Sequence, residues 1–258
     1  MTITSTPARN ESGFTLVELA IVLMIIGLLI GGILRGQELM ENARVTSTIQ
    51  QTKAYDGATT TFRDAYAALP GDIVNPSTRL ANCAAAPCNA TGNGNGIVAP
   101  SAGTATTTLA TYPITGENHT FWVHMATTHL ISGVDPSSPV GTNSWGTQFP
   151  AGKIAGGFQV VSLAVPAGAN NPALSGLYLV LAANPNAGSF NGTAGQNAIS
   201  ALRAAQIDRK LDDGLPQTGD VIGIGSGTNC TGVTSGTAIT YGETDEQKNC
   251  NLLIRAQN

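Results

Sequence analysis

The composition of the chain narrows its function class. Only 11% of the 258 residues are charged, the hydrophobic share is 42%, and Gly, Ala, Thr and Asn fill much of the rest, which is unusual for a cytoplasmic enzyme. The formal charge of -4 is not accompanied by a basic run, so nothing indicates a nucleic-acid partner or attraction to an anionic membrane face. The length allows one sizeable domain or two small ones.

The first predicted element is a membrane-spanning helix. From Phe14 to Leu34 the only ionisable side chain is Glu18, and about 20 apolar residues are what a bilayer-spanning helix needs. A secretory signal would have a shorter apolar core, a basic start and a small-residue cleavage site, and a buried core helix would usually be shorter with a polar side. Because a carboxylate in hydrocarbon is costly, Glu18 is expected at head-group level or beside a cation.

The stretch "GFTLVELAIVLMIIGLL", which begins at Gly13, resembles the processing signal of type IV pilins and of type II secretion pseudopilins. The resemblance implies that a prepilin peptidase cuts between Gly13 and Phe14 and methylates Phe14. It also implies that Glu18 neutralises the N-terminal amine of a neighbouring subunit during filament assembly. The acid would then be unpaired within one chain and paired between chains. Such a pair favours association of the subunits and fixes their axial register.

A single long helix is predicted to continue beyond the membrane. No proline occurs from Phe14 to Leu69, and Pro70-Gly71 follows, so a helix of about 55 residues and about 80 Å is expected. Its second half carries a stripe predicted to be core: Tyr55, Thr59, Phe62, Tyr66 and Leu69. The expected division is a leader at 1–13, a transmembrane and assembly half-helix at 14–36, and a globular head at 37–258 that includes the second half of the helix.

The next segment, up to residue 116, is rich in Gly, Ala, Thr and Asn and is predicted to be an extended surface loop. Its "GNGNG" lacks the preceding strand, the following helix and the lysine of a phosphate-binding loop. The four cysteines form two local pairs, and an even count beside a membrane segment favours disulfides in an oxidising compartment. Other pairings remain open, and zinc is disfavoured by the neighbouring residues. The favoured pairs are Cys83 with Cys88 and Cys230 with Cys250.

The rest of the chain predicts an α+β head. Residues 117–134 indicate a helix with Gly133 as its stop, and its His124 and His129 are poorly spaced for a shared metal. Residues 156–165 and 176–183 are typical of paired strands, residues 198–214 of a helix, and residues 220–225 and 251–256 of short strands. A long N-terminal helix on an antiparallel sheet, with extra short helices and two disulfide loops, resembles the pilin fold.

A cluster of acids around a glycine turn is a candidate calcium site, since calcium prefers carboxylate oxygens, and some pseudopilins carry calcium in C-terminal loops. Alternatively, Asp212 and Asp213 cap the preceding helix or pair with Arg209 and Lys210. A second acidic group near residue 245 is an equal candidate. The first set comprises Asp208, Asp212, Asp213 and Asp220; the second comprises Glu243, Asp245 and Glu246.

No catalytic centre is predicted. The sequence lacks G-x-S-x-G and H-E-x-x-H, and the favoured disulfides leave no cysteine nucleophile. The prediction is a major or minor pilin, held in the inner membrane as a precursor and then polymerised with copies of itself and other pilins into a surface filament. No cofactor is expected, calcium excepted. The alternatives are a periplasmic pseudopilin and, in another class, an uncleaved membrane-anchored periplasmic binding domain.

Overall fold

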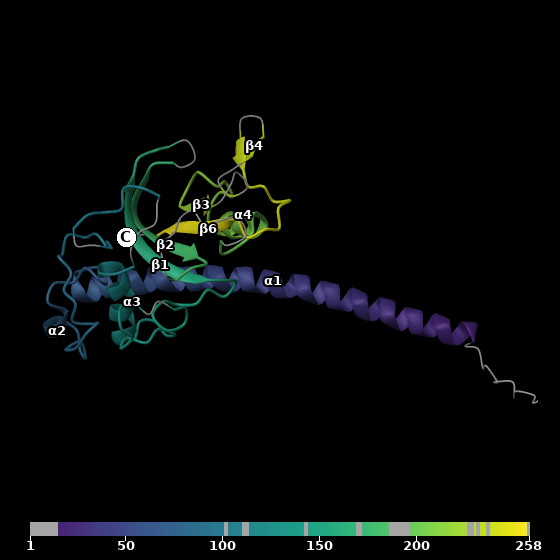
Figure 1. Cartoon of the computed structure of the whole chain (residues 1–258), viewed down its shortest axis with the longest axis horizontal. Helices are drawn as coiled ribbons and strands as arrows, with labels where there is room; N and C mark the ends of the chain where they lie inside the picture. Colours follow the sequence, from purple (N-terminus) through teal and green to yellow (C-terminus); the bar gives the residue numbers. More distant parts are fainter. Residues whose placement is uncertain are drawn as a thin grey trace, which may run out of the picture. The chain divides into compact units, whose positions relative to one another are not determined.

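The computed structural model describes residues 15–100, 103–109, 114–141, 144–168, 172–185, 197–225, 230, 233–235 and 238–256. The chain forms two compact units, one up to Ala43 and one from Arg44 onward. Figure 1 labels the helices and most of the strands.

Helix α1 spans Leu16–Tyr66 and is a single α-helix of 51 residues. It matches the predicted long helix within a few residues at each end. The helix stops before Leu69 because Ala67 adopts a left-handed conformation with φ of 48°, while its backbone N–H still donates to the carbonyl of Arg63. Leu69, the last residue of the predicted stripe, is therefore buried, but it belongs to the loop that follows the helix.

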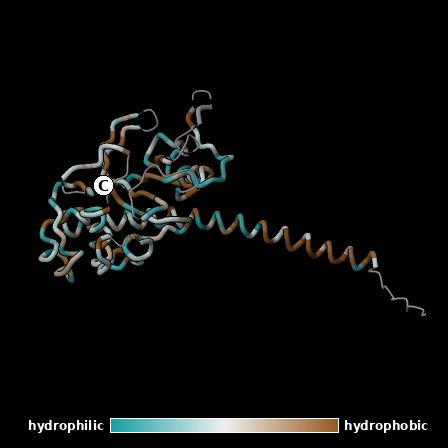
Figure 2. The backbone as a smooth tube through the Cα atoms, viewed as in Figure 1, coloured by the Kyte–Doolittle hydropathy of each residue, from teal (hydrophilic) through white to brown (hydrophobic). Residues whose placement is uncertain are grey.

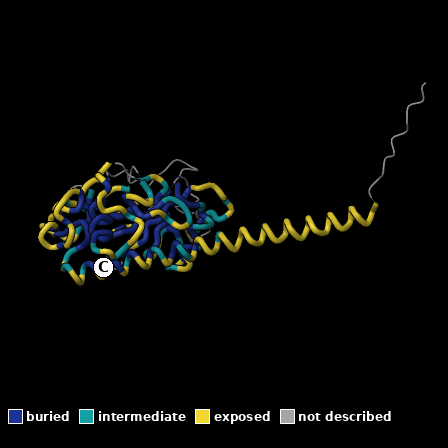
Figure 3. The backbone as a smooth tube through the Cα atoms, turned by 90° about the horizontal axis from the view of Figure 1, so that it is seen from below, coloured by how far each residue is buried: buried dark blue, intermediate teal, exposed yellow. Residues whose placement is uncertain are grey.

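The two parts of α1 differ in burial. Up to Met40 every described residue of the helix is exposed, including a long series of Leu, Ile, Val and Met residues. The backbone of this series is brown in Figure 2 and yellow in Figure 3. From Arg44 onward, buried side chains recur every three or four residues, as expected for one face of a helix. They are Val45, Thr48, Ile49, Thr52, Tyr55, Ala58, Thr59 and Phe62.

The head is built on a four-stranded antiparallel sheet with the strand order β1-β2-β6-β3. The four strands are β1 (Gly157–Val165), β2 (Leu174–Ala182), β3 (Val221–Gly225) and β6 (Cys250–Arg255). A two-stranded hairpin of β4 (Val233–Ser235) and β5 (Ala238–Thr240) was not predicted. The long helix, the antiparallel sheet and the two disulfides confirm the predicted α+β class.

An aromatic cluster joins three elements of the head. The Tyr55 ring of α1 meets Trp122 edge-on with centroids 5.2 Å apart, and meets Phe158 of β1 at 5.4 Å. Trp122 belongs to α3 (Glu117–Thr127), all eleven residues of which are buried. Such edge-to-face pairs add to the apolar burial, so the second half of α1 is part of the core of the head.

Helix α3 ends six residues before the predicted stop at Gly133. The backbone N–H groups of Leu130 and Ile131 both donate to the carbonyl of Met125, and His129 is left-handed with φ of 58°, so the chain turns away. Two further helices are α2 (Pro76–Arg79), within the predicted loop, and α4 (Ala201–Leu211). Helix α4 packs on β3 and β6.

Candidate assembly site and polar sites of the head

Glu18 lies in the first turn of α1 and closes that turn with Thr15. The backbone N–H and the hydroxyl of Thr15 donate to Oε2 of Glu18 at 2.9 and 2.7 Å, and the backbone N–H of Glu18 donates to Oγ1 of Thr15 at 3.2 Å. This reciprocal arrangement is a capping box, which satisfies backbone donors that a helix start leaves free. The carboxylate therefore has local partners in the single chain.

The described part of the chain places no basic group against Glu18. The next ionisable residue along α1 is Arg35, and its guanidinium pairs with Glu38 instead. Between Glu18 and Arg35 the helix carries only uncharged, mostly apolar side chains. Helix α1 is long and apolar enough to cross a membrane, and none of its most apolar window is buried. The first part of α1 thus presents an apolar surface with one acid near its start.

A family model described as the prokaryotic N-terminal methylation motif matches residues 8–34. No curated protein and no solved structure matches the chain significantly. Residues 8–34 carry the type IV pilin and pseudopilin signature. The predicted resemblance is confirmed for this segment, and the motif supports a type IV pilin-like or pseudopilin precursor.

The pilin signature implies cleavage by a prepilin peptidase and assembly into filaments. Gly13 and Phe14, which flank the predicted cut, lie inside the matched segment but outside the described residues. Signature and apolar helix together fit a precursor anchored in a membrane. Pilin-signature proteins are structural rather than enzymatic, while the absence of enzymatic activity in this chain stays a prediction.

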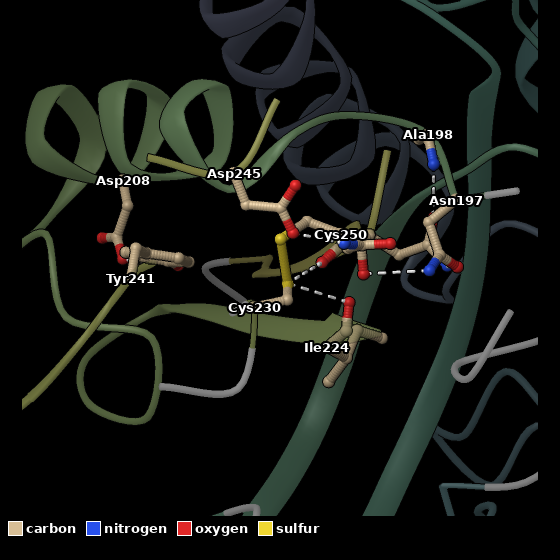
Figure 4. Close-up of a disulfide and its surroundings, with 10 residues drawn as sticks. Asn197, Ala198, Asp208, Ile224, Cys230, Tyr241, Asp245 and Cys250 are labelled. Atoms are coloured by element: carbon tan, nitrogen blue, oxygen red, sulfur yellow. Dashed lines mark hydrogen bonds between the residues drawn. A yellow bond between two sulfur atoms is a disulfide. The ribbon is translucent and has the colours of Figure 1, made fainter. Parts of the chain in front are cut away.

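Both predicted disulfides are formed. Cys83 bonds to Cys88 across five residues and Cys230 bonds to Cys250 across twenty. Cys250 is the first residue of β6, so the second disulfide ties the C-terminal loop to a central strand of the sheet (Figure 4). Each bond restricts the unfolded chain and so stabilises the folded head.

Asp208 is buried beside the C-terminal disulfide loop. Its Oδ2 accepts a hydrogen bond of 2.9 Å from the hydroxyl of Tyr241, and its Oδ1 accepts one of 3.1 Å from the backbone N–H of Gly214. Figure 4 shows Asp208 of α4 and Tyr241 side by side. Burial raises the pKa of Asp208 to about 7, against the lowering effect of these two hydrogen bonds, and the nearby Asp213 and Asp212 raise it further. Asp208 therefore joins α4 to the loop through a carboxyl group that titrates near neutrality.

The candidate calcium set is only partly assembled. One ligand atom each of Asp208, Asp212 and Asp213 lies within 4.8 Å of the others. The carboxylate of Asp212 accepts the backbone N–H of Asp220, so Asp220 takes part through its main chain. Asp213 accepts from the backbone N–H of Leu215 at 2.8 Å and from the hydroxyl of Thr218. These acids shape the turn after α4, and calcium binding stays a prediction.

The suggested pairing of Asp212 and Asp213 with the basic end of α4 is wrong. Arg209 forms its ion pair with Glu243 of the second acidic group, and Nζ of Lys210 lies 3.3 Å from the hydroxyl oxygen of Thr46 on α1. The two basic residues at the end of α4 thus reach the C-terminal loop and the long helix. Asp212 still lies at the C-terminal cap of α4, as the alternative proposed.

The "GNGNG" loop binds an anion that belongs to the same chain. Asp72 is buried, and its carboxylate accepts backbone N–H groups of Gly94 at 2.7 Å, Asn95 at 3.3 Å and Gly96 at 2.7 Å. Successive backbone N–H groups commonly form such a concave anion site. A Cβ at Gly92 would lie 2.4 Å from the Asp72 backbone, so the loop requires glycine there. Sequence reasoning missed this contact because Asp72 and the loop lie about twenty residues apart.

A second buried acid holds the same loop. Glu117, at the start of α3, accepts backbone N–H groups from Asn93 at 3.3 Å and from Ala99 at 3.1 Å. Burial raises the pKa of Glu117, the two hydrogen bonds lower it, and the charge of Asp72 raises it further. Asp72 and Glu117 together hold residues 93–99 through backbone N–H groups. The one sequence signal was that the stretch from residue 80 to residue 116, which Glu117 follows, contains no charged side chain.

His124 is a structural residue of the core. Its Nδ1 accepts the backbone N–H of Gly71 at 2.9 Å, which leaves Nε2 as the donor to the carbonyl of Cys88, also at 2.9 Å. Burial lowers its pKa to about 4, against the raising effect of the Cys88 carbonyl, so the ring is neutral at physiological pH. His129 is exposed. The two histidines share no site, in line with their spacing.

Proposed function

We propose that this chain is a pilin, major or minor, of a type IV pilus-like surface filament. A prepilin peptidase removes residues 1–13 and methylates Phe14. The processed chain is stored in the inner membrane through the first part of α1 and then polymerises with copies of itself and other pilins, with the heads outward.

The observation that carries this proposal is the exposed apolar part of α1 within the matched signature. Its side chains from Leu16 to Leu34 are uncovered, and such a surface in water is costly. Lipid covers it before assembly, and the same surface on other subunits covers it afterwards. A helix that serves in both environments needs no polar face, which agrees with the side chains found there.

Glu18 makes the transfer of the helix from lipid to the filament specific. Its hydrogen bonds to Thr15 satisfy one carboxylate oxygen without neutralising the charge. The cut after Gly13 would create an amine one residue before Thr15 in every subunit. An acid and an amine that meet between chains complete an ion pair in an apolar surrounding, where an unpaired charge is strongly disfavoured.

N-terminal mass spectrometry of the membrane-extracted protein tests the processing step. We expect a chain that begins with methylated Phe14, and a Gly13→Leu variant that keeps its leader. A Ser5→Leu variant, which changes the leader away from the cut, is the matched control and should be processed normally. An intact N-terminus in the wild-type protein would contradict the proposal and support an uncleaved membrane-anchored domain.

Immunogold electron microscopy with an antibody against the head tests the location. We expect labelled filaments outside the cell. Correct processing combined with label confined to the periplasm would instead support the pseudopilin alternative.

A further inference from the structure

The loop around Asp72 contains two Asn-Gly sequences, Asn93-Gly94 and Asn95-Gly96. Asn-Gly is the sequence most prone to spontaneous deamidation, because glycine leaves its own backbone nitrogen accessible. That nitrogen loses its proton and attacks Cγ of the asparagine, so an N–Cγ bond forms while the Cγ–Nδ2 bond breaks and ammonia leaves. Water then opens the resulting succinimide to aspartate or isoaspartate. Both asparagines are exposed, so water has access to them.

The two backbone nitrogens that would attack, those of Gly94 and Gly96, are both hydrogen-bond donors in the structure. The backbone N–H of Gly96 donates to Oδ2 of Asp72 at 2.7 Å. The backbone N–H of Gly94 donates to Oδ1 of Asp72 at 2.7 Å and also to the main-chain carbonyl of Asp72 at 3.0 Å. Charge-assisted hydrogen bonds of this length are strong.

The asparagine side chains are engaged as well. Oδ1 of Asn93 accepts the backbone N–H of Asn95 at 3.0 Å, and Oδ1 of Asn95 accepts that of Ile97 at 2.9 Å. The amide of Asn95 also donates to the carbonyl of Gly103 at 3.2 Å. The bonds to Oδ1 restrict the side-chain rotation that would bring Cγ of either asparagine to the attacking nitrogen, and Nδ2 of Asn95 must also leave the carbonyl of Gly103 before ammonia departs.

We propose that Asp72 protects Asn93 and Asn95 from deamidation by holding the backbone N–H groups of Gly94 and Gly96. The buried carboxylate acts in two ways. It fixes the nitrogen as a hydrogen-bond donor, and its negative charge opposes the amide anion that must form before attack. Ring opening to isoaspartate would insert a methylene into the backbone beside Asp72 and Glu117 and would add a third acid there.

Incubation of the full chain in detergent at mildly alkaline pH, followed by peptide mass spectrometry, tests the proposal. We expect Asp72→Asn to deamidate roughly tenfold or more faster than wild type at these positions, since the loss of a charge-assisted hydrogen bond changes an equilibrium by about that factor. Asn95 should gain more than Asn93, because Gly94 keeps its bond to the main-chain carbonyl of Asp72.

Glu117→Gln is the matched control. Glu117 is the other buried acid of this loop, but its bonds go to the N–H groups of Asn93 and Ala99, neither of which follows an asparagine. We expect this variant to leave both asparagines near the wild-type rate. Equal acceleration in the two variants, or none in Asp72→Asn, would overturn the proposal. Circular dichroism checks that each variant is folded.

The wild-type chain provides a test that needs no variant. Deamidation at Asn93 and Asn95 is compared between the folded chain and the chain reduced and unfolded in urea, with Asn191-Gly192 as a third Asn-Gly sequence in the same sample. We expect folding to slow Asn93 and Asn95 by about tenfold or more. Similar rates in the folded and unfolded chains would overturn the proposal even if Asp72→Asn did not fold.

Discussion

The two parts of helix α1 use the same backbone geometry in opposite ways. From Leu16 to Ala43 the side chains are largely apolar, yet almost all are exposed. From Arg44 to Tyr66 the helix contains six threonines and two glutamines but buries one face in the head. Hydrophobicity alone would therefore assign the wrong half to the protein core. The apolar half is built for contacts outside the single chain, and the more polar half for contacts within it.

The threonines show how the second half tolerates burial. Thr48, Thr52 and Thr59 are buried, and each hydroxyl donates to the carbonyl four residues earlier in the helix. Such bonds satisfy the hydroxyl without a partner from another element. Changes in the first half should therefore affect assembly, and changes in the second half should affect the stability of the head.

The largest expected effect concerns Glu18. We expect Glu18→Ala, expressed as the sole subunit, to insert into the membrane but to lower the yield of sheared filaments on the order of tenfold or more, because the amine of the neighbour loses its partner. Glu38→Ala, in the same exposed part of the helix, is the matched control and should assemble. Wild-type filament yield from Glu18→Ala would contradict the assembly role.

A pair of truncations compares the two halves directly. Phe62 is fully buried and Ile26 is exposed. We expect Phe62→Ala to lower the free energy of unfolding of the head by about 3–5 kcal/mol, the usual cost of removing a buried phenylalanine, and Ile26→Ala to leave it unchanged. Denaturant unfolding of the detergent-extracted chain, followed by tryptophan fluorescence, measures both. A similar loss of stability in the two variants would contradict the proposed division between the two halves of α1.

Removal of the disulfides should have the next largest effect. We expect replacement of Cys230 and Cys250 by serine to lower the free energy of unfolding by about 3 kcal/mol, and the same change at Cys83 and Cys88 by about 2 kcal/mol, because the longer loop restricts the unfolded chain more. Thermal unfolding of the two double variants gives the order. The reverse order would show that contacts around Cys83–Cys88 matter more than chain entropy.

The smallest effect is a pH dependence confined to the head. The pKa of His124 is about 4 in the folded chain, below its ordinary value of 6.5, so this residue removes stability as the pH falls from 6.5 toward 4. The pKa of Asp208 is about 7, above its ordinary 3.8, so this residue adds stability as the pH falls through 7. Between about pH 4 and 6.5 the two contributions oppose each other.

Asp208→Asn separates these contributions. We expect the variant to lose about 1–2 kcal/mol more stability than wild type between pH 7 and pH 5.5, since the stabilising contribution of Asp208 is then removed. Denaturant unfolding at the two pH values measures the difference. An identical pH response in wild type and variant would show that Asp208 does not titrate in this range.

The sequence predicted the features that depend on local pattern. The long helix, the paired strands β1 and β2, helix α4 and both disulfides follow from periodicity, glycine and proline positions and cysteine spacing. The stripe residues Tyr55, Thr59 and Phe62 are buried as predicted. In each case neighbours within a few turns or a single strand decide the conformation.

The sequence did not reveal contacts that depend on tertiary distance. The carboxylate of Asp72 binds N–H groups more than twenty residues away, and the ring of His124 bridges Gly71 and Cys88. Arg209 pairs with Glu243 instead of the adjacent acids because the C-terminal loop returns to α4. No spacing rule describes such partners, since the fold brings them together.

The stretch from residue 80 to residue 116 contains no Asp, Glu, Lys, Arg or His, and Asp72 and Glu117 keep their carboxylates inside the head. Dissolved ions weaken contacts between exposed charges over about 8–10 Å at physiological ionic strength, and this stretch of the chain contributes no charge for them to screen. A contact made through this stretch, by hydrogen bonds and shape alone, would therefore be insensitive to salt concentration.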